Sequence, residues 1–353
     1  MFLRVCVLIC AVLFGKIDGA VPYEPQTSGS VLEPWRWQVF TELRGQGVLC
    51  MTEASDGAFW FGTQEGVQRY DGLTWTAYKF DDAPVNALSP GRNGIIFAGT
   101  ELGIHQFLDG VWQRIFPVKA QTSFPIYDLM VASDGRLWAG TGLGALVWDH
   151  SIWSMYTTDE MAETIFKMMP DVQVETVPQS IAFDRTWSRP EGGIGALIVG
   201  GYPMPHRGDL PMVIGAVAPD GPAHHAGLQG GDQILHVDGK AQVSINAIEG
   251  EAGQEILLNV RQLSGAVRDV RITRTRPTGI VQDFQVHDVL ETQDGALWFA
   301  LNWGEVIKKD VTGAWFRYGD AEGVDTGIRP RLTQDRAGRV WVVSDDGRRN
   351  VNR

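Results

Sequence analysis

The chain has few charged residues and no excess of basic ones. Of its 353 residues only 20% are Asp, Glu, Lys or Arg, and the 42 acidic residues outnumber the 30 basic ones, giving a net charge of −12. Nucleic acids and anionic membrane surfaces attract clusters of Lys and Arg, so neither is expected as a partner. Glycine, at 42 positions, and tryptophan, at 13, are abundant instead. This composition predicts an all-β fold with many turns rather than a helical bundle.

Patterns that predict catalysis or a bound cofactor are missing. No G-x-S-x-G, H-E-x-x-H or P-loop sequence is present, although a Ser-His-Asp set assembled across the fold stays open. Cys6 and Cys10 lie near the N-terminus, in a segment expected to be removed, which leaves Cys50 alone and predicts no disulfide. His224 and His225 are adjacent on an expected short helix and should be surface residues. We therefore expect no catalytic residue, no metal and no cofactor.

The first twenty residues have the pattern of a targeting segment. Arg4 precedes ten apolar residues at 5–14, and Asp18-Gly19-Ala20 provides small residues after them. Ten apolar residues are too few to cross a bilayer, so 1–20 is predicted to be a secretory signal peptide with no stable membrane span beyond it. Because Asp18 is unusual near a cleavage site, an uncleaved anchor is the alternative. The expected location is periplasmic or secreted.

A short pattern built on a turn glycine recurs five times. Its copies are Ser55–Thr63, Arg92–Thr100, Ser133–Thr141, Gln293–Ala300 and Arg336–Val342, with turn glycines at 57, 94, 135, 295 and 338. A second tryptophan follows in the first four units, at 75, 112, 153 and 315. Asp-Gly and Asn-Gly pairs favour tight hairpins because glycine accepts a positive φ. A period near 40 residues with four short strands predicts the blades of a β-propeller.

The aromatic residue of each copy, at 60, 97, 138, 298 and 341, should fill the layer between blades. The last unit has room for only three strands, whereas Trp37-Gln38-Val39-Phe40 looks like the last strand of a blade with nothing before it. We therefore predict that the N-terminal strand completes the last blade and closes a five-bladed propeller. A chain cut inside a longer array is the alternative.

These units resemble the two-component regulator propeller repeat. The resemblance rests on Asp-Gly-x-x-Trp-x-Gly-Thr at 56–63, Gly-Val-x-Arg-Tyr at 66–70 and a tryptophan strand from Trp75, and it extends over 35–157 and 284–353. It implies a periplasmic sensing part of the kind joined to histidine kinases or diguanylate cyclases, with a possible small ligand at the propeller. The chain itself contains no kinase or cyclase segment.

The interval between the third and fourth turn glycines is longer than one repeat by about 120 residues. Only Trp187 of the 13 tryptophans lies in 158–283, which predicts a separate domain inserted between two blades. A capping box at Thr157 and Glu160 predicts a short amphipathic helix that ends at Pro170 and docks on its own domain.

Within the insert, the sequence 221–240 resembles a PDZ domain; the resemblance rests on Pro222-Ala223, Ala226-Gly227-Leu228, Gly231-Asp232, Ile234-Leu235 and Val237-Asp238-Gly239-Lys240. The domain should span about 190–276. The resemblance implies an α+β fold that adds a peptide strand to a sheet edge and holds its terminal carboxylate on backbone amides. Between Lys240 and Gly250 only a short helix fits, so the groove is expected to be shallow or closed, and a purely packing role is the alternative.

The resemblance assigns the peptide-binding residues by position. Amides of Ile194, Gly195 and Ala196, after Gly193, would bind the carboxylate, Arg189 would add positive charge, and Ile198, Ile245 and Ile248 would line the pocket for the last side chain. The expected function is therefore an exported, non-catalytic binding or sensor protein that captures C-terminal or extended peptides on a propeller platform. The alternatives are a propeller hydrolase or lyase, with His, Asp and Glu converging at one face of the ring, a protease-associated scaffold, and a detached sensor ectodomain.

Overall fold

The computed structural model describes residues 39–79, 84–117, 124–185, 193–199, 212–241, 247–276, 281–301, 305–324, 330–344 and 351–352. The chain divides into two units, 1–44 and 45–353. In the first, the described part contains the 3-10 helix η2 (Thr41–Leu43). Val39 and Phe40 precede it without belonging to a strand, so the predicted N-terminal strand is wrong for these two residues. Trp37 and Gln38 lie outside the described residues.

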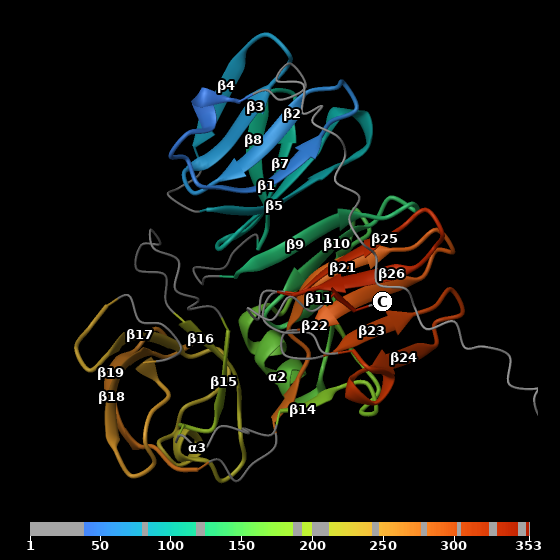
Figure 1. Ribbon diagram of the computed structural model, residues 1–353. Coiled ribbons are helices and arrows are strands. Elements are labelled where there is room, and N and C mark those ends of the chain that lie inside the picture. Colours follow the sequence, from blue (N-terminus) through green and yellow to red (C-terminus); the bar gives the residue numbers. More distant parts are fainter. Residues whose placement is uncertain are drawn as a thin grey trace, which may run out of the picture. The chain divides into compact units, whose positions relative to one another are not determined.

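Five antiparallel sheets repeat one arrangement in the second unit (Figure 1). Blade 1 is β1 (Val48–Glu53), β2 (Phe59–Thr63), β3 (Gly66–Tyr70) and β4 (Trp75–Lys79); blade 2 is β5 (Val85–Pro90), β6 (Ile96–Thr100), β7 (Gly103–Leu108) and β8 (Val111–Phe116); blade 3 begins with β9 (Ile126–Val131), β10 (Leu137–Thr141), β11 (Gly144–Trp148) and β12 (Trp153–Thr157). Blade 4 is β21 (Val286–Glu291), β22 (Leu297–Leu301), β23 (Val306–Lys309) and β24 (Trp315–Tyr318), and blade 5 is β25 (Arg331–Gln334), β26 (Val340–Val343) and β27 (Val351–Asn352). Short 3-10 turns η3 (Arg92–Gly94) and η5 (Asp320–Glu322) complete these blades.

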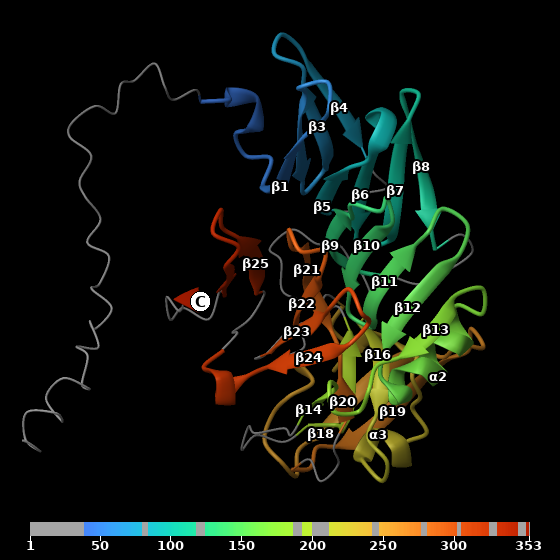
Figure 2. The ribbon, with the colours of Figure 1, turned by 90° about the vertical axis from the view of Figure 1, so that its right-hand side faces the viewer.

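The first strand of each blade lies beside the first strand of the next. β1 contacts β5, β5 contacts β9, β9 contacts β21 and β21 contacts β25, and Figure 2 shows this succession from β5 to β21. The blades thus pack face to face around their first strands, which are called the inner strands below. The β-propeller predicted from the repeats is confirmed, and blade 5 has three described strands.

The repeated Gly-Thr followed by glycine has a local structural reason. The hydroxyls of Thr63, Thr100 and Thr141 donate to the carbonyls of Gly66, Gly103 and Gly144 at 3.0, 3.1 and 2.8 Å, which closes the turn between the second and third strands. The three glycines have φ of 135°, 122° and 140°. A Cβ at any of them would overlap a carbonyl oxygen of the fourth strand, so only glycine fits.

Aromatic side chains fill the layer between blades, but not at every predicted position. Trp60 is buried and packs edge-on to Phe107 of the next blade with ring centroids 4.9 Å apart, and Phe97 and Trp138 are buried as well. Trp298 and Trp341 are only half-buried, which corrects the prediction for these two. Trp298 faces blade 5. The described sheet of blade 5 has three strands instead of four, so it covers less of the indole ring of Trp298.

The insert begins as an extension of blade 3. The helix α2 (Asp159–Met168) is followed by β13 (Gln173–Thr176), which pairs parallel to β12 as a fifth strand of that sheet. The cap of α2 is Thr158, whose hydroxyl accepts from the Met161 amide at 3.3 Å, rather than the predicted Thr157. Thr157 instead donates to the carbonyl of Leu143 at 2.6 Å, because it is still part of β12.

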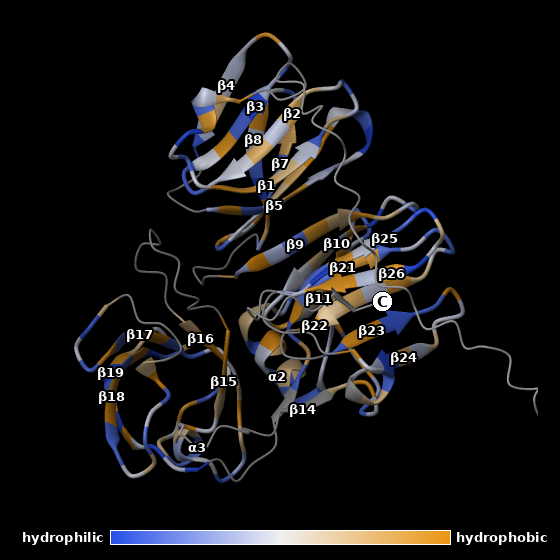
Figure 3. Ribbon diagram, in the orientation of Figure 1, coloured by the Kyte–Doolittle hydropathy of each residue, from blue (hydrophilic) through white to orange (hydrophobic). Residues whose placement is uncertain are grey.

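A five-stranded sheet forms the body of the insert. It runs in the order β15 (Ala196–Val199), β16 (Met212–Val217), β17 (Gln233–Val237), β18 (Glu255–Arg261) and β19 (Val267–Thr273), with α3 (Pro222–His225) between β16 and β17. Before and after it, β14 (Phe183–Arg185) and β20 (Val281–Asp283) pair antiparallel with each other. Figure 3 shows hydrophobic residues along β15 and β16 as along the blade strands.

The inserted sheet shares a hydrophobic core with blade 3. Leu197 and Val199 of β15 belong to the same buried cluster as Leu143 of the blade and Ile165 of α2. The hydroxyl of Thr164 in α2 donates to the carbonyl of Gly215 in β16 at 2.8 Å. The helix therefore packs between the blade and the inserted sheet and does not present its apolar face to solvent. Among the helices that the structure describes, none has the length and apolar character needed to cross a bilayer.

Candidate peptide-binding loop and propeller centre

The glycine loop ahead of β15 is fixed by backbone hydrogen bonds. Gly193 and Thr275 exchange two of them, at 2.9 and 3.0 Å. The carbonyl of Ile194 accepts from the Ala223 amide at 2.8 Å, and the carbonyl of Gly195, whose φ is 70°, accepts from a further amide at 2.8 Å. Within the described ranges, the N–H groups of Ile194 and Gly195 have no hydrogen-bond partner. Both residues are buried, where an unpaired amide is costly, so the loop is set to donate to an acceptor.

The apolar side chains assigned to the pocket lie together but inside the domain. Ile194, Ala196, Ile198 and Ile248 belong to one buried cluster and are each 3% exposed or less. They therefore pack the core rather than face an open pocket. Arg189 and Ile245 lie outside the described residues, so their assigned roles stay predictions.

Arg274 is a residue of this region that the sequence reasoning missed. Its guanidinium is buried and donates to the carbonyls of Ile248 at 3.0 Å and Ala247 at 3.1 Å. These two residues follow the segment expected to wall the peptide groove. Arg274 thus holds the end of that wall against the sheet. The alternation of charged and apolar residues in 268–274 marks a strand, but nothing in it distinguishes Arg274 from its neighbours.

β15 is an edge strand with both faces covered. In the described sheet its only strand neighbour is β16. Ile198 points into the core of the inserted sheet, whereas Leu197 and Val199 contribute to the cluster shared with blade 3. β15 also contacts β20. With both faces covered, only the edge of β15 could take the backbone hydrogen bonds of an added strand.

A second feature of the insert is a groove of about 540 Å³ beside α3. Its lining includes Asp220, His225, Arg271 and Arg276. Asp220, His224 and His225 are exposed, and each offers one ligating atom within 4.8 Å of the others. The two histidines are surface residues, as predicted, but their neighbour Asp220 was not foreseen as a third member of the group.

At the centre of the propeller, five inner strands each contribute one residue at the same register. Cys50, Ala87, Asp128, Asp288 and Arg331 all lie seven residues before the turn glycine of their unit. Arg331 donates to Asp288 Oδ1 at 2.8 Å and lies 3.5 Å from Asp128 Oδ1. The charge of Arg331 also lowers the pKa of the Cys50 thiol, against the larger effect of burial. This regular spacing is the sequence signal that could have identified the group.

Burial and mutual repulsion change the protonation of this cluster. Desolvation, reinforced by the charge of Asp288, raises the pKa of Asp128 to about 8 even though Arg331 opposes the shift. Desolvation also raises the pKa of Asp288, although the charge of Arg331 opposes the shift. Burial raises the pKa of the Cys50 thiol to about 12. One guanidinium thus faces two carboxyl groups, the buried Asp288 and the half-buried Asp128, whose pKa values are both raised.

The same carboxyl groups join neighbouring blades. Asp128 Oδ2 of blade 3 accepts from the Val289 amide of blade 4 at 3.1 Å, and Asp288 Oδ2 of blade 4 accepts from the Leu332 amide of blade 5 at 2.5 Å. In the same register the Cys50 thiol donates to a carbonyl of blade 2. Each polar residue therefore satisfies a backbone group of the next blade, which is a structural role for the cluster.

Comparison with protein families identifies one domain. A family model described as a PDZ domain matches residues 213–261, from β16 through β18. The chain therefore combines propeller blades with a PDZ domain. No curated protein matches the chain.

Solved structures with similar arrangements are distant. A virginiamycin B lyase from Staphylococcus aureus is 15% identical, with 84% of this chain and 76% of that one covered and a TM-score of 0.35. The extracellular domain of a hybrid two-component system protein from B. thetaiotaomicron is 13% identical, over 85% of this chain but only 38% of that one, with a TM-score of 0.29. A photosystem II D1 C-terminal processing protease is 28% identical over 25% of this chain and 24% of its own, with a TM-score of 0.21.

Proposed function

We propose that the chain is an exported binding protein whose PDZ domain captures C-terminal or extended peptides along the edge of β15. The observation that carries the proposal is the pair of buried N–H groups at Ile194 and Gly195, which have no acceptor among the described residues, next to that edge. Consecutive backbone amides in such a loop form a concave binding site for a carboxylate. A peptide running along β15 from this loop would gain main-chain hydrogen bonds as a sixth strand.

The buried state of Ile198 and Ile248 shapes the expected specificity. Because these side chains already fill the domain core, they leave little space for a large terminal side chain. We propose that the carboxylate and the main chain supply most of the affinity, so that peptides with small last residues bind as well as those with large ones.

The test is a titration of the full chain with fluorescent peptides that differ only in a free or an amidated C-terminus. Binding that requires the free carboxylate supports the proposal. Gly195→Ala should weaken binding, because φ at this position is 70° and its Cβ would meet Pro222 and Gly221 at 3.3 and 3.4 Å. Gly253→Ala is the matched control, since it imposes the same kind of backbone strain in a turn where nothing lies within 4 Å.

Equal affinity for acid and amide, or no binding by a chain shown to be folded, would refute carboxylate capture. Equal losses in the two glycine variants would attribute the effect to general destabilisation rather than to the loop.

We further propose that the blades serve as a sensing platform outside the cytoplasm and that the chain is not an enzyme. The support is the resemblance of the repeats to two-component regulator propellers and the N-terminal pattern of a signal peptide. Cell fractionation of the expressed chain tests the location.

A hydrolase or lyase is the second candidate, favoured by the two carboxyl groups of Asp128 and Asp288 with raised pKa values beside Arg331. Against it, both carboxyl groups already accept hydrogen bonds from neighbouring blades. The test is a hydrolase or lyase activity assay on the wild-type chain and on Asp288→Asn. Activity that the wild type shows and the folded variant lacks would favour the enzyme.

A further inference from the structure

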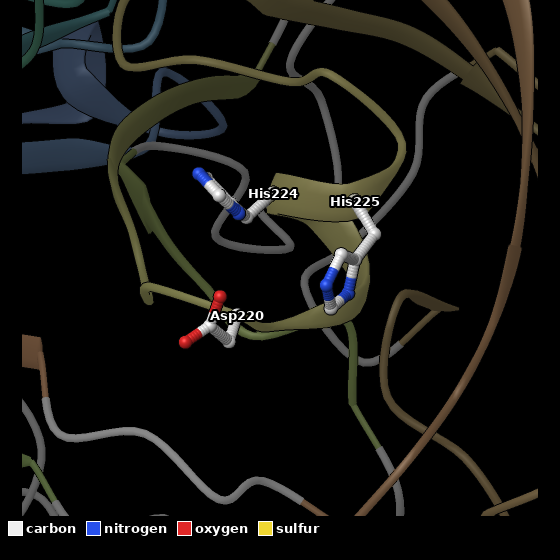
Figure 4. A group of neighbouring side chains, drawn as sticks. All are labelled: Asp220, His224 and His225. Carbon is white, nitrogen blue, oxygen red and sulfur yellow. The ribbon is translucent and has the colours of Figure 1, made fainter.

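Three side chains able to bind metal lie together at α3. Figure 4 shows Asp220 on the loop that enters the helix and His224 and His225 on the helix itself. Each provides one ligating atom, a carboxylate oxygen or an imidazole nitrogen, within 4.8 Å of the other two. The three side chains are exposed and are not among the loop residues assigned to the peptide, although the loop packs against α3 through Ile194 and Ala223.

We propose that Asp220, His224 and His225 bind a divalent transition-metal ion, with zinc as the reference ion. Two imidazoles and one carboxylate are the donor set that zinc and copper accept, whereas calcium and magnesium prefer oxygen ligands alone. This site goes beyond the proposed peptide capture and does not depend on it.

The distances suit a site that closes on its ion. Zinc bonds to nitrogen and oxygen of about 2.0–2.1 Å in a tetrahedral shell place ligand atoms roughly 3.3 Å apart. The present separations, up to 4.8 Å, are longer than this, so binding requires the side chains to rotate toward one ion. All three side chains are exposed, so this rotation meets no packed neighbours.

The backbone that carries the three residues is already fixed. Asp220 adopts a φ of 58°, which turns the chain into α3. The Gly221 amide donates to Ala218 at 3.1 Å, and the Ala223 amide donates to Ile194 at 2.8 Å. Binding would therefore order three side chains without reorganising the loop, which favours a defined site over an adventitious one.

The groove beside α3 determines what completes the coordination shell. Asp220 and His225 line it together with Arg271 and Arg276. Three protein ligands leave at least one position of the ion open. With two guanidinium groups in the same groove, an anion such as a carboxylate fits that position better than a further cationic group.

Zinc titration of the full, tag-free chain tests the site, followed by calorimetry or by competition with a chromogenic chelator. We expect saturable binding of one ion, weakened about 10-fold or more by His224→Ala, His225→Ala or Asp220→Asn, since loss of a direct ligand should cost no less than loss of its supporting shell. Calcium and magnesium should not compete. The matched control is His236→Gln, which removes an imidazole of the same domain on β17, where it contacts Asn259.

Each outcome decides the proposal. No saturable zinc binding by the folded chain would refute it, as would binding that survives all three substitutions and so belongs to another group. If His236→Gln weakened zinc binding as much as the three site variants do, the effect would come from loss of any histidine or of the fold, and the proposed site would be refuted. Circular dichroism of every variant establishes that the exposed substitutions leave the fold intact.

Discussion

Replacing Asp128 with asparagine should change how the stability of the blades depends on pH. In the folded chain Asp128 and Asp288 face a single guanidinium, Arg331, and burial with mutual repulsion raises the pKa of Asp128 to about 8. In the unfolded chain an aspartate titrates near 3.9. Asparagine keeps the shape and can still accept the hydrogen bond from the Val289 amide, but it cannot ionise.

The sign and size follow from the two pKa values. Between about pH 4 and pH 8 the folded chain holds a proton at Asp128 that the unfolded chain has released, so stability falls as pH rises. The slope for one such proton is about 1.4 kcal/mol per pH unit. From pH 5 to pH 7 the free energy of unfolding of the wild type should therefore fall by up to about 2.7 kcal/mol through this group. The same fall should be absent in Asp128→Asn.

Urea unfolding at several pH values measures the difference. Tryptophan fluorescence reports on the blades, because only Trp187 of 13 tryptophans lies within 158–283. Glu65→Gln, which removes a carboxyl group at an exposed turn, is the control and should keep the wild-type slope. Parallel pH profiles for wild type and Asp128→Asn would refute the reasoning, because they would show that the carboxyl group releases no extra proton on unfolding.

Three further substitutions test the packing. Trp138→Ala should destabilise the blades by about 3–5 kcal/mol in urea unfolding, since the ring is 1% exposed; a loss below about 1 kcal/mol would contradict its place in the layer between blades. Gly142→Ala should cost about 1–3 kcal/mol, because its methyl group would overlap Val199 Cγ1 of the PDZ domain, and faster proteolysis of the insert would report the loosened contact. Thr164→Val should cost about 1–3 kcal/mol by leaving the Gly215 carbonyl without its donor; an unchanged midpoint would mean that the contact at α2 adds no stability.

The blades could be predicted because their signals are local. A turn that needs a positive φ selects glycine independently of the surrounding fold. Gly57 and Gly135, for example, have φ of 80° and 93°. Trp60 and Trp138 follow from the same register. The half-buried position of Trp298 could not be predicted in this way. Its burial depends on how many strands the next blade contributes, and the sequence around residue 298 carries no information on that number.

The centre of the propeller and the contacts of the insert could not be read in this way. Each of the first four inner strands changes register at a bulge, as between Val48 and Cys50, just before the residue that faces the centre. The pattern of apolar residues alone does not locate such a bulge. Similarly, nothing in Leu197 or Val199 indicates that their partners are in blade 3 rather than in the PDZ core, since hydrophobic burial has no direction.

The pairing of β14 with β20 has a consequence for how this architecture can arise. The register joins Phe183 to Asp283 and Arg185 to Val281, so the chain leaves and returns through two adjacent antiparallel strands. With the intervening domain removed, the same two strands would need only a tight turn to form an ordinary hairpin. Recombination into such a hairpin adds a domain without altering the order in which the blades pack. The close approach of Val199 to Gly142 means that such a domain, once inserted, would share its apolar core with the host blade.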